Sequence, residues 1–329
     1  MRSAMPMVTL ARHAMATRFE FVLHGADPVG LRAAGEEALE EIDRIEAELS
    51  LFRPSSQIAH LNARAAREPV RVTPEVFGLL KQAKQLSAET GGAFDISIAP
   101  LVRCWGFMGG GGRRPDREEL AAARANIGMH LVELNPDELT VRFARNGVMM
   151  DLGAIGKGYA IERAAELLRE AGVTSGLIHG GTSTVCALGR PPEADAWRVA
   201  VDRPEAGQQP GATPPEAAGS PRTLAVVPLQ DEAMSVSGIR GKFFEAEGRV
   251  FGHILDPRTG EPATAAVMAL VVLRSATETD ALSTALLTLG PEEHDRIASL
   301  RAGMKTLVVS ESDGQLRTVC RGIALEPGE

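Results

Sequence analysis

The stretch "DLGAIGKGYAIERAAELL", residues 151–168, joins an acidic residue, a glycine-rich turn and the start of an amphipathic helix. Asp151 ends a segment that has the pattern of a strand. Helix N-termini present free N–H groups and partial positive charge, so a glycine-rich entry beside Lys157 suits a phosphate. The spacing matches neither GxGxxG nor GxxxxGK[ST]. From the residues alone, a phosphate site and a plain strand-to-helix turn are equally supported.

Two helices are predicted on the N-terminal side of this stretch. Residues 27–52 carry leucine and isoleucine at helical spacing, with Asp27 as the N-cap and Pro28 in the first turn. Residues 73–92 form a second pattern of this kind, which Thr73 caps and a Gly-Gly pair ends. Both segments therefore have start and stop signals as well as an apolar face.

Strand patterns and a third helix surround these elements without regular alternation. We expect strands at 17–25, 96–100, 222–229 and 266–275, hairpins at 131–153 and 175–189, and a helix at 277–290. This order predicts an α+β fold, a mostly antiparallel sheet with helices packed on it.

Composition limits the class of protein. The chain has 329 residues, enough for a full core, and a net charge of -8 with no basic run to offset it, which argues against nucleic-acid binding. Residues 202–221 are rich in Pro, Gly, Ala and Gln and have little to bury. We expect them to be a mobile insertion within one domain.

The cysteines and the N-terminus bear on the compartment. The three cysteines are far apart and form no CxxC pair, which argues against a zinc site or a disulfide framework. The first residues contain neither an uninterrupted apolar core of a signal peptide nor a lipobox. No stretch reaches the roughly 18 apolar residues of a membrane helix. We expect a cytoplasmic protein without a membrane span, with an exported location left open.

The segment "TDALSTAL", residues 279–286, is a candidate cation site. Asp280 and Thr284 stand four residues apart, on one face of a helix near its start. One carboxylate and one hydroxyl, together with phosphate oxygens, suit magnesium. The alternative is structural: Thr277 or Thr279 caps the helix, Asp280 favours its first turn and Thr284 fills space.

Two further segments contain polar residues in turns. In "HILDPRTGEP", residues 253–262, His253 precedes a turn that Pro and Gly explain by themselves, and it is either a general base or a structural histidine. In "TGGAFDISIAPLVRCWGF", residues 90–107, Asp95 and the Trp-Gly-Phe cluster form either a hydrophobic anchor with a turn aspartate or the wall of a pocket.

Taken in order, these segments resemble the ApbE family of FAD:protein FMN transferases. The likeness runs from about residue 8 to about 320, and its most specific parts are D-L-G-A-I-x-K-G-Y, H-I-x-D-P-R-T-G and D-A-x-x-T-A. It implies a single domain of the tunnelling-fold type, residues 8–322, with FAD across a cleft. It also implies Mg²⁺-dependent transfer of FMN from FAD to a Thr or Ser hydroxyl of an acceptor flavoprotein, with release of AMP.

The resemblance also assigns roles to residues. Asp280, Thr284 and the carbonyl of Ala154 match the family's metal ligands, and His253, Asp280 and Lys157 its catalytic positions. The positions matching FAD contacts are Met15, Phe52, Asn62, Ala93, Phe94, Asp95, Asp151, Lys157 and Ile254. Phe52 falls where an aromatic ring often stacks on the flavin, and Asn62 near the diphosphate, where it tunes transfer against hydrolysis.

The chain departs from the family pattern at two places. In "SVSGIRGKFF", residues 235–244, Val236, Ile239 and Arg240 replace a threonine, an acidic residue and a tyrosine. Thr182 replaces the usual aspartate after two glycines. Two alternatives to the transferase follow: an Mg²⁺-dependent FAD diphosphatase that yields FMN and AMP, and an FAD-binding protein without catalysis, which the first departure favours.

Overall fold

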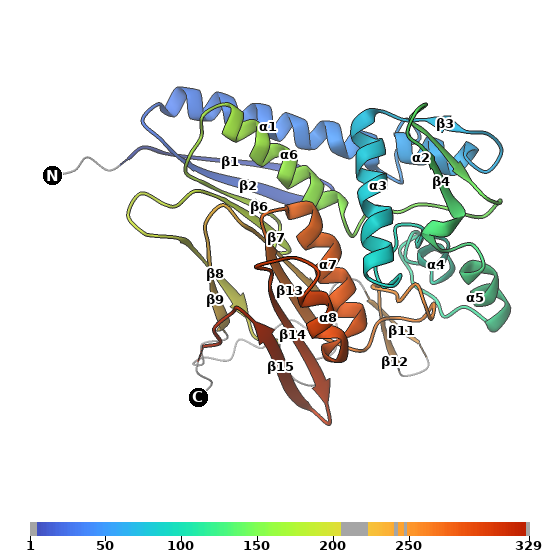
Figure 1. Cartoon of the computed structure of the whole chain (residues 1–329). Coiled ribbons are helices and arrows are strands. Elements are labelled where there is room, and N and C mark those ends of the chain that lie inside the picture. Colours follow the sequence, from blue (N-terminus) through green and yellow to red (C-terminus); the bar gives the residue numbers. More distant parts are fainter. Residues whose placement is uncertain (1–4, 205–222, 240–242, 247–248, 327–329) are drawn as a thin grey trace.

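An eight-stranded antiparallel sheet forms the centre of the computed structural model, which describes residues 5–204, 223–239, 243–246 and 249–326 (Figure 1). The strand order is β1-β2-β6-β7-β10-β13-β14-β15, and every neighbouring pair is antiparallel. The strands are β1 (Met7–Ala14), β2 (Thr17–His24), β6 (Gly176–Gly180), β7 (Thr184–Leu188), β10 (Ala233–Gly238), β13 (Met268–Leu273), β14 (Lys305–Ser312) and β15 (Gln315–Arg321). The predicted α+β class with a mostly antiparallel sheet is confirmed.

Three long helices cover one face of this sheet. They are α1 (Pro28–Leu49), α6 (Gly156–Glu170) and α7 (Ala276–Leu289), and they contact one another in that order across the strands (Figure 1). The remaining helices are α2 (Gln57–Arg64), α3 (Pro74–Glu89), α4 (Ala99–Cys104), α5 (Arg117–Arg124) and α8 (His294–Ala298), with 3₁₀ turns η1 (Met129–Leu131) and η2 (Pro291–Glu293). No described helix is both long and apolar enough to cross a membrane.

A hairpin of β8 (Trp197–Asp202) and β9 (Thr223–Leu229) packs on the opposite face of the sheet. Strand β13 is consequently buried on both sides: Ala269 and Val271 face the helices, whereas Leu270 and Val272 face the hairpin. This explains why its sequence "MALVVL" is continuously apolar instead of alternating.

Two smaller sheets complete the fold. One joins β3 (Val70–Arg71), β5 (Thr140–Phe143) and β4 (Val132–Asn135), and the other is the hairpin of β11 (Phe243–Ala246) and β12 (Arg249–Gly252). An aromatic cluster of Trp105, Phe107, Phe244 and Phe251 fixes the second hairpin to α4, with ring centroids 5.5 Å apart for Trp105 and Phe251. This cluster is separate from the main core.

The predicted starts of α1 and α3 are confirmed. The Asp27 side chain accepts a hydrogen bond from the Val29 N–H at 3.0 Å, and Thr73 Oγ1 accepts one from the Val76 N–H at 3.4 Å. Such caps satisfy N–H groups that have no partner within the helix.

The cap predicted for α7 is wrong. Neither Thr277 nor Thr279 caps this helix, because it begins earlier, at Ala276, and Ser275 Oγ accepts from the Glu278 N–H at 3.2 Å. Thr279 lies inside the first turn, where its hydroxyl donates to the Ala276 carbonyl at 2.9 Å.

Residues 96–100 do not form the expected strand. Asp95 accepts hydrogen bonds from both the N–H and the hydroxyl of Ser97, which turns the chain into α4 at Ala99. Only an isolated bridge between Ile98 and Met149 remains. The segment that precedes Asp151, which has the pattern of a strand, likewise joins no sheet beyond that bridge.

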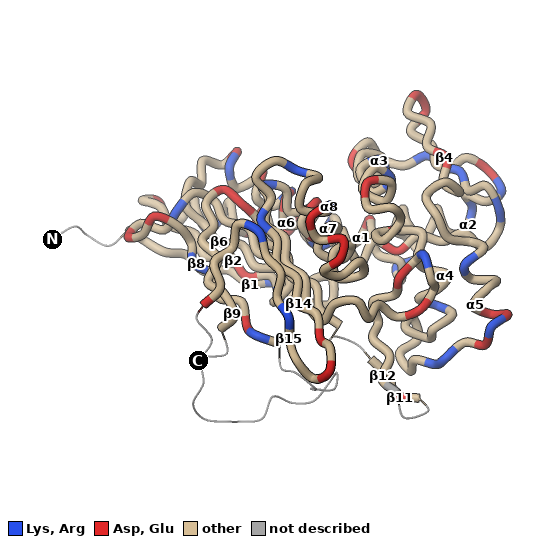
Figure 2. Tube along the Cα trace, turned by 60° about the horizontal axis from the view of Figure 1, so that its bottom comes forward, with Lys and Arg blue, Asp and Glu red and all other residues tan. Residues whose placement is uncertain are grey.

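The insertion predicted at 202–221 connects β8 to β9, and its residues 205–221 lie outside the described part of the chain, so that prediction is untested. Arg240, one of the departures from the family pattern, also lies outside it. Basic and acidic residues are interspersed along the described trace (Figure 2).

Candidate active site

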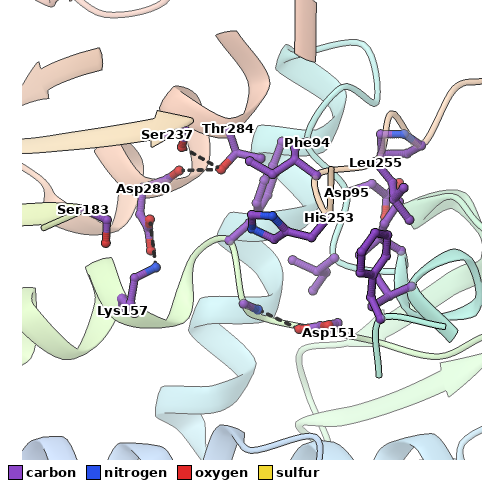
Figure 3. Close-up of a pocket in the computed structure, with 18 of the residues that line it drawn as sticks. Phe94, Asp95, Asp151, Lys157, Ser183, Ser237, His253, Leu255, Asp280 and Thr284 are labelled. Atoms are coloured by element: carbon purple, nitrogen blue, oxygen red, sulfur yellow. Dashed lines mark hydrogen bonds and ion pairs between the residues drawn. The ribbon is translucent and has the colours of Figure 1, made fainter. Parts of the chain in front are cut away.

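A cavity of about 830 Å³ opens where α6, α7 and β10 meet the segments that contain Asp95 and His253 (Figure 3). Its size is that of a cofactor site. It is lined by twelve of the predicted site residues, namely Met15, Phe52, Ala93, Phe94, Asp95, Asp151, Ala154, Lys157, His253, Ile254, Asp280 and Thr284. Segments that are distant in sequence thus meet at one place. Asn62 is the exception.

The buried carboxylate of Asp280 anchors one end of the cavity. Its Oδ2 accepts a hydrogen bond from the Gly158 N–H at 2.9 Å, and its Oδ1 lies 3.7 Å from Lys157 Nζ. Both partners come from the first turn of α6. One of the free N–H groups predicted at this helix start, that of Gly158, therefore faces a carboxylate of the protein itself.

Gly158 is required for this approach of α6 to α7. A Cβ atom at this position would lie 2.2 Å from the Ala276 carbonyl oxygen and 2.7 Å from the Asp280 Cβ. A second link holds the same two helices together, because the Glu162 carboxylate accepts from Ser275 Oγ and from the Thr277 N–H, both at 2.7 Å. The two links hold Asp280 and Lys157 in register.

Hydroxyl groups fix the other side of α7 to β10. Ser237 Oγ lies 3.3 Å from Thr284 Oγ1 and 2.9 Å from Ser283 Oγ, and Thr284 Oγ1 donates to the Asp280 carbonyl at 3.2 Å. Deeper in the structure, the buried Ser235 bonds Thr279 at 2.8 Å. Figure 3 shows Ser237 and Ser183 beside the Asp280–Thr284 pair.

Sequence reasoning assigned no role to Ser183 and Ser237, although both line the cavity. A signal was present at Ser237, because Ser235 and Ser237 recur with period two in a strand whose other residues are apolar. That pattern places two hydroxyls on one buried face.

The donors at this end suit a hard divalent cation. Asp280, Thr284 and Ala154 line the cavity together and offer a carboxylate, a hydroxyl and a backbone carbonyl. Within the described part of the chain, no group of three or more His, Cys, Asp or Glu side chains could hold a metal. A small set of oxygen donors fits Mg²⁺, which keeps several of its waters and takes further ligands from phosphates.

Asp151 lies in the loop that enters α6. Its N–H donates to the Ile96 carbonyl at 2.7 Å, and its Oδ1 accepts from the Gly153 N–H at 2.8 Å. Burial raises the pKa of Asp151 above its ordinary value, and the Gly153 hydrogen bond opposes this shift in part.

Asn62 is not among the residues that line the cavity, and its predicted contact near the diphosphate stays a prediction. Its amide nitrogen donates to the Met150 carbonyl at 2.9 Å, and its amide oxygen accepts from the Met150 N–H at 2.7 Å. Because this pairing uses both ends of the amide, Asn62 acts on the backbone one residue before Asp151 and supports the loop from behind.

His253 leads into a turn whose other polar groups are engaged with one another. Arg258 donates to the Asp256 carboxylate through Nε at 2.9 Å and through a terminal nitrogen at 2.8 Å. Trp105 Nε1 donates to the Gly260 carbonyl at 2.8 Å, which attaches the turn to the aromatic cluster. His253 is thereby held at the cavity, between its charged and apolar parts (Figure 3), and Ile254 also lines the cavity.

Both interpretations of residues 90–107 apply, each to different side chains. The Asp95 carboxylate is a turn aspartate: besides Ser97, it accepts from the Met129 N–H at 3.1 Å. Trp105 is a buried anchor, whereas Phe107 lines the cavity. At the rim, Phe52 is 73% exposed and leaves its ring face open to a ligand.

The cavity combines a charged end, formed by Lys157, Asp280 and Thr284, with an apolar end that includes Phe107 and Leu255. A cavity of this kind suits a small molecule that has a polar part and an apolar part. The chain belongs to the ApbE family, whose model matches residues 15–308.

Relatives and solved structures are similar over most of the chain. The chain is 28% identical over 293 residues to an FAD:protein FMN transferase of Klebsiella pneumoniae, which covers 86% of this chain and 78% of the relative. It is 32% identical over 269 residues to an FAD:protein FMN transferase of Treponema pallidum, with 80% of this chain and 73% of the relative covered. The flavinyl transferase ApbE of Pseudomonas stutzeri superimposes with a TM-score of 0.83 at 27% identity (98% of this chain, 96% of that one). The ApbE protein of Thermotoga maritima gives 0.80 at 27% identity, with 98% and 97% covered.

Proposed function

We propose that this protein is an FAD:protein FMN transferase, which moves FMN from FAD to a Thr or Ser hydroxyl of an acceptor flavoprotein and releases AMP. The observation that supports this most strongly is the convergence of Lys157, Asp280 and Thr284 at one end of a cavity whose other end is apolar, in a chain of the ApbE family. The charged end suits the diphosphate of FAD, and the apolar parts suit its rings.

In this reaction the acceptor hydroxyl oxygen forms a bond to the FMN phosphorus, and the bond from that phosphorus to the AMP oxygen breaks. Negative charge grows on the non-bridging oxygens and on the leaving phosphate. Within the described part of the chain, Lys157 is the cation that lines this end, and positive charge placed there stabilises such a transition state.

His253 is the candidate base that takes the proton of the acceptor hydroxyl. Imidazole titrates near neutral pH, and His253 lies at the cavity between the charged and apolar parts. Asp280, Thr284 and the Ala154 carbonyl would hold Mg²⁺. When bound, this ion supplies positive charge that offsets the charge of the diphosphate.

The test combines purified protein, FAD, Mg²⁺ and a threonine-containing flavoprotein target, followed by mass spectrometry. We expect a covalent FMN adduct on the target and one AMP for each adduct. AMP with free FMN and no adduct would indicate a diphosphatase instead, and bound FAD without AMP would indicate binding without catalysis.

The Asp280→Ala variant tests the site within this assay. We expect turnover and the Mg²⁺-dependent part of FAD affinity to be lost. A matched control is Asp137→Ala, an exposed aspartate in the turn between β4 and β5, which should behave as wild type. Full activity of Asp280→Ala would show that the assignment of Asp280 is wrong.

A further inference from the structure

The two carboxylate oxygens of Asp280 have partners of different kinds. Oδ2 is bonded to a backbone N–H, that of Gly158, which the packing of α6 on α7 holds in place. Oδ1 faces Lys157 Nζ at 3.7 Å. The Asp280 side chain is only 5% exposed, and a charge buried to this degree needs a compensating charge. Lys157 supplies this charge.

Unlike the backbone N–H of Gly158, the ammonium group of Lys157 can move away from Asp280. Its side chain is 24% exposed and lines the cavity, and its long, flexible stem allows the ammonium group to turn toward a ligand. A divalent cation bound to Oδ1 would stand close to the position of this ammonium. Because like charges repel strongly at such distances in a partly buried site, both cannot remain there.

We propose that Lys157 is an exchangeable counter-ion of Asp280, which a divalent cation displaces toward the phosphate part of the cavity. This inference rests on the proposed function, in that Asp280 binds the cation. Two consequences follow. The cation binds weakly while Lys157 neutralises Asp280, and cation and anionic ligand favour each other, because the ligand offers the displaced ammonium a new partner.

The test measures Mn²⁺ binding by electron paramagnetic resonance in the protein without FAD, so that catalysis plays no part. In Lys157→Met, Mn²⁺ should bind about tenfold more tightly than in wild type, within the usual range of coupling between two sites. Lys157→Arg keeps the charge and should bind as weakly as wild type. Lys81→Met removes the same charge from an exposed position on α3 and should leave the affinity unchanged.

Thermal unfolding provides a second readout on the same variants. Without a divalent cation, Lys157→Met leaves Asp280 without its counter-charge and should melt below wild type. Mn²⁺ should then raise its Tm by more than it raises the Tm of wild type. An Mn²⁺ affinity in Lys157→Met that is equal to or weaker than that of wild type would overturn the inference.

Asp280→Asn separates this inference from the proposed function. If Asp280→Asn binds Mn²⁺ as well as wild type does, the cation site itself is wrong, and the counter-ion role falls with it. If Mn²⁺ binding depends on Asp280 but is indifferent to Lys157, only the exchange is refuted and the cation site stands.

Discussion

Replacing Gly158 with alanine tests the contact that joins α6 to α7. The added methyl would lie 2.2 Å from the Ala276 carbonyl oxygen, which belongs to the backbone and cannot rotate away. The helices must therefore separate, and the hydrogen bond from the Gly158 N–H to Asp280, 2.9 Å long in the structure, must lengthen.

The loss in the free energy of unfolding of Gly158→Ala follows from three effects. Forcing a methyl into a packed interface costs about 2 kcal/mol, and losing a hydrogen bond to a charged, buried group costs about 2 kcal/mol more. The higher helix propensity of alanine returns about 1 kcal/mol. The free energy of unfolding should therefore fall by about 3 kcal/mol. Because Asp280 shifts relative to Lys157, turnover should fall by roughly 100-fold.

Urea denaturation and AMP release measure the two effects. Gly156→Ala is the matched control in the same turn, since its methyl would meet only Leu152 and Leu49 side-chain atoms at 4.0 Å, an ordinary contact. This control should be neutral or slightly stabilising. If Gly158→Ala is as stable and as active as Gly156→Ala, the close packing of the two helices is not what positions Asp280.

Three further changes have defined outcomes. Ala16 has a φ of 57°, which costs alanine about 1 kcal/mol relative to glycine, so Ala16→Gly should raise the urea midpoint; a lower midpoint would contradict the turn geometry. Asn62→Ala leaves the buried Met150 backbone without partners and should lower the free energy of unfolding by about 2 kcal/mol. Fluorescence titration should also show weaker FAD binding. Unaltered stability would refute the role of the Asn62–Met150 hydrogen bonds. The raised pKa of Asp151 means that its ionised form is disfavoured in the native state. In denaturation series across pH, Asp151→Asn should therefore be more stable than wild type above about pH 4 and equal to it below. A difference in stability that does not change with pH would exclude this cause.

The helices were predictable because their signals are local. Asp27 and Thr73 cap α1 and α3 as expected, since a cap depends on a few neighbouring residues. In both errors in local structure, a polar side chain just before the predicted element forms the hydrogen bonds that decide the course of the chain. Residues 96–100 have strand composition, but the bonds of Asp95 to Ser97 turn the chain, and Ser275 takes the cap that the threonines were expected to provide.

The site was predictable only in part. The resemblance named twelve residues that the fold brings to one cavity, from positions as distant as Met15 and Thr284. It did not reveal the bonds of Asn62, because a sequence does not show that both ends of an amide are occupied by a backbone 88 residues away. The role of Ser237 was not predicted either, because its hydroxyl bonds hydroxyls of α7, which are distant in sequence.

The aromatic cluster has a consequence for how such a cavity can change. Trp105 and Phe251 hold the apolar wall from a core of their own, whereas Asp280 and Lys157 depend on the packing of α6 on α7 in the main core. Substitutions around the cluster can therefore reshape the apolar wall while the charged end keeps its geometry. To make the protein accept altered flavins, substitutions should begin with the residues that surround Phe107 and leave α6 and α7 unchanged.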